Sequence, residues 1–434
     1  MAENQKVLPY PYNFSNGKLF CESVELEQLA KKFGTPLFVY SERAIADSFL
    51  EIKKSVQNWP VEVCYAVKAN SNLEILKILG NYGAGFDVVS KGELLRVLKV
   101  IKKPCKIVFS GVGKSEEEMS LAINSEIFCI NVESISELVT LNNIANKLDK
   151  IAPISIRVNP DISANTHPYI STGLKENKFG LSITQAKKAY EIASTLENLK
   201  IVGVDCHIGS QITETAPFIE STKRILKFID NVKEIPKTNL HIDLGGGLGI
   251  CYKDEKLPNT KQFFSSILES IKLWSIEKNH NMPKIIFELG RSIVGPAGVL
   301  LCKVLTLKHG DENNKKNFVI VDAAMNDLLR PSLYKAYHEI FPISNLKNSQ
   351  TTEKWDIVGP ICESGDWLGK DRRIKTCEGE YLGIASVGAY ASSMSSNYNS
   401  RVKPAELVIR KSGNVDLIRK RESFEDLISN EIVD

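Results

Sequence analysis

Lys68 is the residue of this chain with the clearest capacity for covalent chemistry. It directly follows the run Val61–Val67, which is typical of a buried strand, so its amine is expected at the C-terminal end of that strand. Burial disfavours the ammonium form of lysine, and the neutral amine is the form that makes a Schiff base with an aldehyde. The alternative is a lysine that ends a strand and extends its charge to water. Lys68 is therefore a candidate nucleophile for an aldehyde cofactor.

A glycine-rich segment, Gly245-Gly-Gly-Leu-Gly249, is the second candidate for site chemistry. It directly follows the strand-like run Leu240–Leu244, and glycines without Cβ let backbone amides approach a phosphate closely. The segment is no dinucleotide fingerprint, because the third glycine of that pattern would fall on Ile250. A tight structural turn is the alternative. His207 ends the preceding strand-like run and Ser210 follows it, and an aromatic ring beside a phosphate cradle indicates a planar, phosphorylated cofactor.

Glu288 lies in a further strand-like run, Ile285–Leu289. A carboxylate there could pair with a ring nitrogen and keep it protonated, which strengthens a pyridoxal ring as an electron sink. The alternative is an ion pair with Arg291, three residues further on. The two interpretations are compatible.

The elements that would position these residues alternate between strand-like and helix-like periodicity. Segments such as 72–79 and 184–193 place apolar residues at helical spacing. The eight strand-like runs are Val61–Val67, Gly85–Val89, Lys106–Ser110, Ile127–Asn131, Ile154–Asn159, Ile201–His207, Leu240–Leu244 and Ile285–Leu289. Eight such units predict an α/β fold with a closed (β/α)8 TIM barrel of roughly 250 residues, whose chemistry lies at the C-terminal strand ends. An open, doubly wound sheet is the alternative.

A second domain is indicated by a change of period after residue 295. Alternating runs there predict strands at Val299–Leu307, Phe318–Asp322, Leu382–Val387 and Glu406–Arg410. We expect residues 36–295 to form the barrel and residues 296–434 to form a mostly β domain of sandwich or barrel type. Residues 1–35 are expected to join that β domain.

The bulk composition is that of an ordinary globular protein with small-molecule partners. The chain has 434 residues, 43% of them hydrophobic and 25% charged, with a net charge of +3. No basic stripe indicates nucleic acid, and no apolar stretch approaches a signal peptide or a membrane span, so we expect a cytoplasmic protein without membrane contact. Nine cysteines without a C-x-x-C pair and six scattered histidines predict neither a disulfide framework nor a metal site.

Nine short segments together are more specific than any single motif. They are Val63–Asn70, Gly85–Glu93, Arg157–Pro160, Lys178–Gly180, Cys206–Gln211, Asp243–Gly247, Glu288–Arg291, Gly359–Asp366 and Tyr390–Met394. They occur in the order found in the fold-type III pyridoxal-phosphate decarboxylases, which the chain resembles from about residue 20 to about residue 415. Within that family the motifs are most similar to those of diaminopimelate decarboxylases. Leu289 departs from the pattern, since the family usually has proline there.

This resemblance implies roles for the residues at the barrel's strand ends. The cofactor would be pyridoxal 5'-phosphate, with Lys68 as its covalent anchor, His207 stacked on its ring and Glu288 opposite its nitrogen. Arg157 resembles the family arginine near the ring oxygen, with Asp87 close by. The phosphate-binding positions are matched by Ser210, Gly245, Gly246, Gly247 and Tyr390.

The resemblance also implies a head-to-tail homodimer with two active sites at the interface. Cys362 and Glu363 resemble residues that the partner subunit delivers, and the cysteine would be a catalytic proton donor. As a cysteine alone, Cys362 would be read as an inert buried thiol. The substrate-binding positions are matched by Arg291, Arg330, Tyr334 and Tyr390.

The substrate can be argued from the charges that the matched positions carry. Arg291 and Arg330 can bind a carboxylate as a fork while Glu363 receives an ammonium, which suits a substrate with amino-acid groups at both ends. We expect decarboxylation of meso-diaminopimelate to L-lysine. The alternatives are a decarboxylase for arginine, ornithine or carboxynorspermidine, an amino-acid racemase, and a non-catalytic homologue. A racemase has no need of the Cys362 motif, and a non-catalytic homologue tends to lose the lysine or the phosphate contacts.

Overall fold

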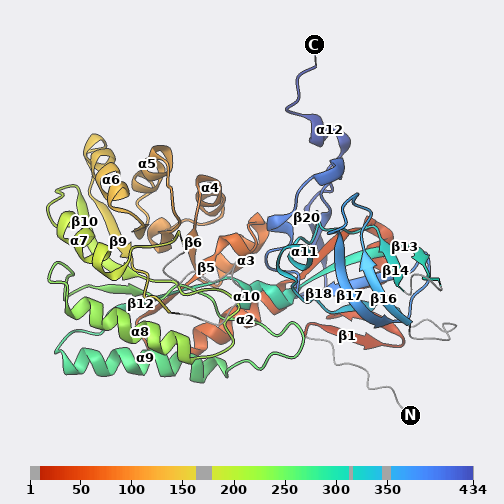
Figure 1. Ribbon diagram of the computed structural model, residues 1–434, viewed down its shortest axis with the longest axis horizontal. Coiled ribbons are helices and arrows are strands. Elements are labelled where there is room, and N and C mark those ends of the chain that lie inside the picture. The colour runs from red at the N-terminus through yellow and green to blue at the C-terminus, as the bar shows by residue number, and fades with distance from the viewer. Residues whose placement is uncertain (1–9, 163–177, 312–315, 345–352, 434) are drawn as a thin grey trace. The chain divides into compact units, whose positions relative to one another are not determined.

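The computed structural model describes residues 10–162, 178–311, 316–344 and 353–433, and these form two compact units (Figure 1). The barrel domain consists of residues 47–251 and 255–293. The β domain consists of the described residues up to 46, of residues 252–254 and of those from 294 onward.

The barrel domain contains a closed ring of parallel strands. Within the described residues the order around the ring is β10-β11-β12-β5-β6-β7-β8-β9. The strands are β5 (Val61–Ala66), β6 (Gly85–Val88), β7 (Ile107–Phe109), β8 (Cys129–Val132), β9 (Ala152–Arg157), β10 (Leu199–Asp205), β11 (His241–Asp243) and β12 (Lys284–Leu289). Each strand-like run predicted from the sequence overlaps one of them, with ends that differ by up to two residues. The closure of the ring confirms the TIM barrel and rules out the open sheet.

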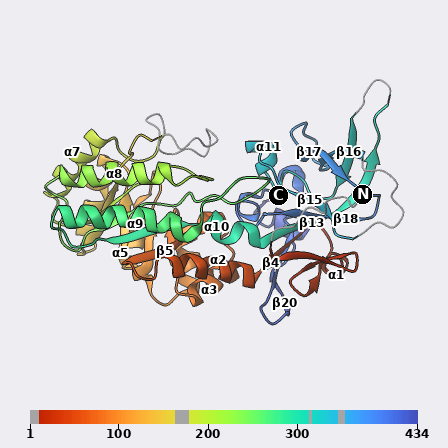
Figure 2. The same ribbon diagram turned by 90° about the horizontal axis from the view of Figure 1, so that it is seen from below.

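Helices connect these strands, and α7, α8 and α9 lie outside the ring of strands in both ribbon views (Figures 1 and 2). The barrel helices are α2 (Glu42–Ser55), which begins in the β domain, α3 (Leu73–Asn81), α4 (Lys91–Val100), α5 (Glu116–Asn124), α6 (Ile135–Lys147), α7 (Ile183–Ala193), α8 (Ala216–Asp230), α9 (Thr260–Glu277) and, across the boundary, α10 (Arg291–Val294). Side-chain caps fix several of their starts. Ser115 and Glu118 form a capping box at α5, which satisfies two backbone amides that the helix itself leaves unpaired.

The β domain has one large sheet and one small sheet. The large sheet runs β17-β16-β14-β13-β4-β19-β20, with β15 and β18 pairing off this path, and the small one runs β1-β2-β3. The elements are β1 (Tyr12–Ser15), β2 (Lys18–Cys21), β3 (Val24–Glu25), α1 (Leu26–Phe33), β4 (Leu37–Ser41), β13 (Gly298–Lys308), β14 (Asn317–Val321), α11 (Arg330–Tyr334), β15 (Ile340–Pro342), β16 (Glu353–Val358), β17 (Trp367–Ile374), β18 (Tyr381–Ala385), β19 (Ala405–Ile409), β20 (Val415–Arg419) and α12 (Phe424–Ile428). The predicted strands correspond to β13, β14, β18 and β19.

The N-terminal domain boundary differs from the expected one. The sequence predicts a barrel that starts at residue 36, but β4 pairs with β13 and β19 in the large sheet and so belongs to the β domain. All five residues of β4 are buried. A strand buried on both faces lacks the alternating pattern that would have distinguished it from a barrel strand.

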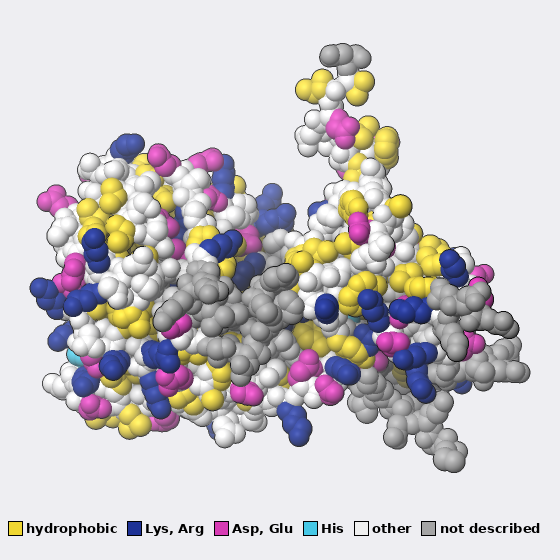
Figure 3. Space-filling view, in the orientation of Figure 1, with side chains coloured by type: hydrophobic (Ala, Val, Ile, Leu, Met, Phe, Trp, Pro, Cys, Tyr) yellow, Lys and Arg dark blue, Asp and Glu magenta, His cyan; other side chains and the backbone are white. Residues whose placement is uncertain are grey.

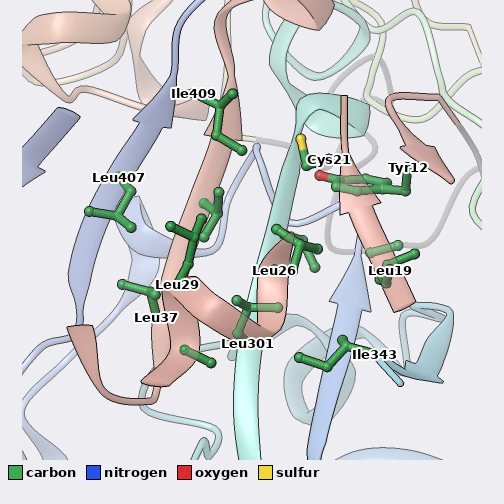
Figure 4. Close-up of a cluster of buried hydrophobic side chains, with 14 of the residues drawn as sticks. Tyr12, Leu19, Cys21, Leu26, Leu29, Leu37, Leu301, Ile343, Leu407 and Ile409 are labelled. Atoms are coloured by element: carbon green, nitrogen blue, oxygen red, sulfur yellow. The ribbon is translucent and has the colours of Figure 1, made fainter. Parts of the chain in front are cut away.

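Apolar side chains from the sheets and from α1 form one core of the β domain (Figure 4). Leu26 and Leu29 on α1 pack with Leu37 on β4 and Leu301 on β13, each at most 5% exposed. In the barrel interior, Cys64 and Cys129 pack as small apolar residues with Val108 and Ile286. All nine cysteines are free thiols.

Basic and acidic side chains are interspersed on the face of the molecule in Figure 3. Among the described residues, no helix combines the length and the apolar character that crossing a membrane requires.

Candidate functional site

Lys68 lies just beyond the end of β5, in the 3-10 turn Val67–Ala69. Its Nζ is 2.5 Å from Oδ2 of Asp87, a fully buried residue of the neighbouring strand β6. The Lys68 side chain is 38% exposed, so it is less desolvated than the sequence argument required. A buried carboxylate at this distance favours the ammonium form. Asp87 is therefore placed to hold the amine in position.

His207 lies two residues beyond β10 and is oriented by the glycine loop. Its Nδ1 accepts a hydrogen bond from the Gly246 amide at 3.1 Å, so in the neutral ring the proton sits on Nε2. Burial and the positive charges of Arg157 and Lys68 lower the pKa of His207 well below its usual value. The site therefore contains a neutral imidazole in a fixed tautomer.

The glycine loop after β11 could not contain larger residues. A Cβ on Gly246 would lie 1.9 Å from the Glu288 carbonyl oxygen, and one on Gly247 would lie 2.3 Å from that of Gly209. Gly245 and Gly247 also have positive φ angles of 64° and 112°. The Gly245 amide donates to Asp243 and the Gly246 amide donates to His207, so the loop is fixed by its own hydrogen bonds.

Glu288 projects from β12 and is 7% exposed. A chain of hydrogen bonds orients it: Ser155 Oγ donates to Asn131 Oδ1 at 2.5 Å, Asn131 Nδ2 donates to Ser110 Oγ at 3.0 Å, and Ser110 Oγ donates to Glu288 Oε1 at 3.0 Å. Burial, and then the charges of Asp87 and Asp205, raise the pKa of Glu288 to about 8. Glu288 is thus a rigidly held carboxyl group that takes up a proton near neutral pH.

Two further carboxylates beside Glu288 were missed as site residues. Asp205 on β10 and Asp243 on β11 stand opposite each other in the parallel register, and both are at most 2% exposed. Ligand oxygens of Asp205, Asp243 and Glu288 all lie within 4.8 Å of one another. The sequence did contain a signal, since each aspartate is the last residue of its barrel strand, where site residues are expected.

Arg157 ends β9 and is held by its neighbours on several sides. Its Nη1 donates to Glu133 Oε1 at 2.9 Å, and its guanidinium lies over the Phe179 ring at 4.9 Å. The Gly180 amide donates to the same Glu133 carboxylate at 2.9 Å. Burial alone would lower the pKa of Arg157, but Glu133 and Asp205 outweigh it and raise that pKa. The motif Lys178–Gly180 therefore helps to fix a permanent cation.

Arg291 is the first residue of α10 and is 6% exposed. Its Nη2 donates to Ser210 Oγ at 3.0 Å. The guanidinium is thereby attached to the strand-end segment that carries His207, next to the glycine loop. Leu289, which replaces the usual proline, is buried at the end of β12.

The remaining expected residues lie in the β domain. Arg330 begins α11, is 5% exposed, is 2.8 Å from His338 Nε2 and lies over the Tyr252 ring at 4.6 Å. Tyr334 ends the same helix, and Tyr390 has a positive φ of 58°.

Cys362 and Glu363 are exposed on a turn of the β domain. The Cys362 amide donates to Asn399 Oδ1 at 2.8 Å, and the Tyr398 hydroxyl donates to Glu363 Oε2 at 3.2 Å. The exposure of Cys362 differs from the buried thiol that a cysteine alone would suggest, and it leaves the sulfur accessible. The expected residues thus form one group in the barrel domain and a second set in the β domain.

Comparisons with known proteins agree with this geometry. Residues 42–295 match the family model described as "Pyridoxal-dependent decarboxylase, pyridoxal binding domain". The chain is 46% identical over 416 residues to the diaminopimelate decarboxylase of Haemophilus influenzae, covering 96% of this chain and 98% of that protein.

Two solved structures are similar over nearly the full length. Diaminopimelate decarboxylase from M. jannaschii in complex with L-lysine has a TM-score of 0.91 at 40% identity and covers 99% of both chains. The Helicobacter pylori enzyme with L-lysine has a TM-score of 0.86 at 43% identity and covers 94% of this chain and 99% of that one. The chain therefore belongs to the pyridoxal-dependent decarboxylases and, among them, to the family of the diaminopimelate decarboxylases.

Proposed function

We propose that this protein catalyses the pyridoxal-phosphate-dependent decarboxylation of meso-2,6-diaminopimelate to L-lysine and CO2, the last step of lysine biosynthesis. The observation that carries the proposal is the convergence, at one end of a closed barrel, of a lysine amine, a neutral imidazole, a glycine cradle and a buried carboxyl group. The near full-length similarity to diaminopimelate decarboxylases supports the choice of substrate.

The barrel residues fit the cofactor on several independent grounds. The glycine loop directly follows the barrel strand β11, where residues without Cβ can let a phosphate approach the backbone closely. The oxygen Oδ1 of Asp87 is buried and has no hydrogen-bond partner among the described residues, next to the amine that would bind the aldehyde. Glu288 has the burial and the proton affinity expected of a partner for a ring nitrogen. When bound, pyridoxal phosphate supplies a ring that accepts the electron pair left by CO2.

Each barrel residue then has a specific task. Lys68 would bind the aldehyde carbon through Nζ, and Asp87 would hold that amine in position. His207 would cover one face of the ring, since its neutral imidazole adds no competing charge. Glu288 would keep a proton on the ring nitrogen, while Arg157 would face the ring oxygen. Ser210, the glycine loop and Tyr390 would surround the phosphate.

Substrate selection would depend on the arginines and on the exposed turn of the β domain. Arg291 and Arg330 present forks that match a carboxylate, and Glu363 matches an ammonium group. Tyr334 and Tyr390 would add hydroxyl contacts. The Sγ of Cys362 would return a proton to the carbon that has lost CO2.

We further propose a head-to-tail homodimer in which Cys362 and Glu363 complete the partner's site, as the family resemblance implies. Their exposure on the β domain leaves them available for such a role. A cytoplasmic location is proposed as well, since nine free thiols suit a reducing compartment.

The central experiment is the replacement Lys68→Ala. We expect purified wild-type protein to be yellow, to become covalently labelled by borohydride reduction, and to release CO2 from meso-diaminopimelate. Lys68→Ala should lose the borohydride-dependent label and most of the turnover, because the covalent attachment point is gone. Glu93→Gln is the control: the Glu93 carboxylate accepts a hydrogen bond from the Val89 amide and interacts electrostatically with Lys68, but its replacement leaves the amine in place and should retain the label. A Lys68→Ala protein that decarboxylates at near the wild-type rate would overturn the assignment.

A further inference from the structure

Behind Glu288, the barrel interior contains a pair of carboxylates that the proposed function does not use. Asp205 and Asp243 face each other across neighbouring strands, and their oxygens lie within 4.8 Å of each other and of Glu288. Among the described residues, Asp205 Oδ1 and Asp243 Oδ2 have no hydrogen-bond partner. Buried polar atoms without partners are rare in native structures, which points to a proton or a cationic group in this space.

Three carboxylates at this spacing cannot all be ionised in a buried site. The nearby cations only partly balance them, because Lys68 is paired with Asp87, and Arg157, which lies 4.0 Å from Asp205, is also held by Glu133 at 2.9 Å. The ionisable groups that face Glu288 from the surrounding strands and turn are Cys64, Lys68, Asp87, Arg157, Asp205 and Asp243. An additional positive charge at Glu288, such as a protonated ring nitrogen, would therefore be stabilised.

The two aspartates differ in their surroundings, which decides where the proton of the pair resides. Arg157 Nε lies 4.0 Å from Asp205 Oδ2 and favours the charged form of Asp205. Asp243 accepts one hydrogen bond from the Gly245 amide and is otherwise faced by Glu288 and Asp205. Burial raises the pKa of Asp205 to about 7 and that of Asp243 well above its usual value. Asp243 is thus the better site for the proton and Asp205 for the charge.

We propose that Asp205 is a positioning residue for the cofactor: Asp243 holds a proton, so the pair carries one negative charge, on Asp205, and this charge keeps a second proton bound between Glu288 and the ring nitrogen. This inference rests on the proposed function, since it acts through a pyridine ring opposite Glu288. The pair would contribute by its charge and needs no contact with the substrate.

The test compares the affinity of the cofactor-free protein for pyridoxal phosphate with its affinity for the 1-deaza analogue, in which carbon replaces the ring nitrogen. Asp205→Asn removes the charge at constant size, so it should weaken binding of pyridoxal phosphate about tenfold more than binding of the analogue. Asp205→Ser is a second uncharged variant with the same expected preference. Asp243→Asn should change the ratio little, because an amide replaces a neutral carboxyl group.

Asp327→Asn in the β domain is the matched control. Asp327 is also a buried carboxylate, its pKa is raised to about 7, and it accepts a hydrogen bond from the Ala324 amide. Its replacement should leave the affinity ratio unchanged.

An unchanged ratio of the two affinities in both Asp205 variants would overturn the proposal, including the case in which both affinities fall by the same factor. Stoichiometric binding of Mg²⁺ or Mn²⁺ to the cofactor-free protein, abolished by Asp205→Asn, would also overturn it, because the pair would then be a metal site. The wild-type protein separates these outcomes from failure of the proposed function. If it fails to acquire the borohydride-dependent label or to decarboxylate diaminopimelate, the function is wrong, whatever the Asp205 variants do.

Discussion

At the scale of single residues, the site obtains its chemistry from the surroundings of each group. Lys68 is held by Asp87, His207 by the glycine loop, and Arg157 by Glu133. Each of these partners comes from a different segment of the barrel. Residue type and strand position therefore predicted the candidates, whereas the charge state of each depends on contacts that only the closed ring creates.

The pH dependence of stability should report the proton on Glu288. Its pKa is about 8 in the folded protein against an ordinary value of 4.5, so between these values the folded state binds a proton that the unfolded state releases. The free energy of unfolding of the cofactor-free protein should therefore fall as pH rises through this range, by about 1.4 kcal/mol per pH unit for one proton. Glu288→Gln should show a shallower decline in urea titrations. The same slope in both proteins would contradict the assigned proton.

Arg291 provides the specificity prediction. Arg291→Lys keeps the charge but loses the fork, and a charge-assisted contact of about 1.5–3 kcal/mol predicts a loss of roughly tenfold or more in kcat/KM for meso-diaminopimelate. Arg224→Lys, an exposed arginine on α8, is the matched control and should be unaffected. Lysine has no distal carboxylate, so the kcat/KM for any slow turnover of lysine should decrease much less in Arg291→Lys. An equal loss for both compounds would assign Arg291 to the cofactor pocket or to the fold.

At the scale of elements, the glycine loop after β11 packs directly against the backbone of β12. Gly246→Ala would place a Cβ 1.9 Å from the backbone oxygen of Glu288, and this atom cannot move without shifting β12. We expect a loss of about 3 kcal/mol or more in the free energy of unfolding, or a protein that fails to fold.

Gly92→Ala on α4 is the control for this change. Its Cβ would meet only Ser90 Oγ, at 3.8 Å, so the variant should lose nothing and gain up to about 1 kcal/mol from helix propensity. Thermal and urea unfolding of the two variants measure the difference. A Gly246→Ala protein as stable as the wild type would mean that the loop is not tightly fitted against β12.

The elements also show which parts of the molecule the sequence could predict. Eight strand-like runs and their intervening helical periods predicted the barrel, because each repeated unit has a clear apolar signature. The boundary at β4 was misplaced, since that strand is buried throughout and carries no alternation. The chain from Ser155 through Asn131 and Ser110 to Glu288 was not predicted, because it joins residues up to 178 positions apart in the sequence. Such contacts depend on strand order and register.

At the scale of the whole molecule, the candidate residues divide between two domains. Lys68 and Glu288 belong to the barrel domain, whereas Cys362 and Glu363 belong to the β domain. A head-to-tail dimer would let one subunit's β domain serve the other subunit's barrel. The proposed dimer therefore predicts that two inactive variants can complement each other, which would not happen if each chain formed its own complete site.

Two inactive proteins, Lys68→Ala and Cys362→Ala, should recover activity when they are mixed and allowed to exchange subunits. Statistical exchange makes half of the dimers mixed, and each mixed dimer has one site with both residues intact, so roughly a quarter of the wild-type activity is expected. In the control, Lys68→Ala is mixed with the double variant Lys68→Ala, Cys362→Ala. Neither protein has Lys68, so no dimer contains a complete site and the mixture should stay inactive. Exchange is followed independently by mass spectrometry of differently tagged subunits. Demonstrated exchange without recovered activity would show that Lys68 and Cys362 act within one chain, and the shared site would have to be abandoned even if the protein is a dimer.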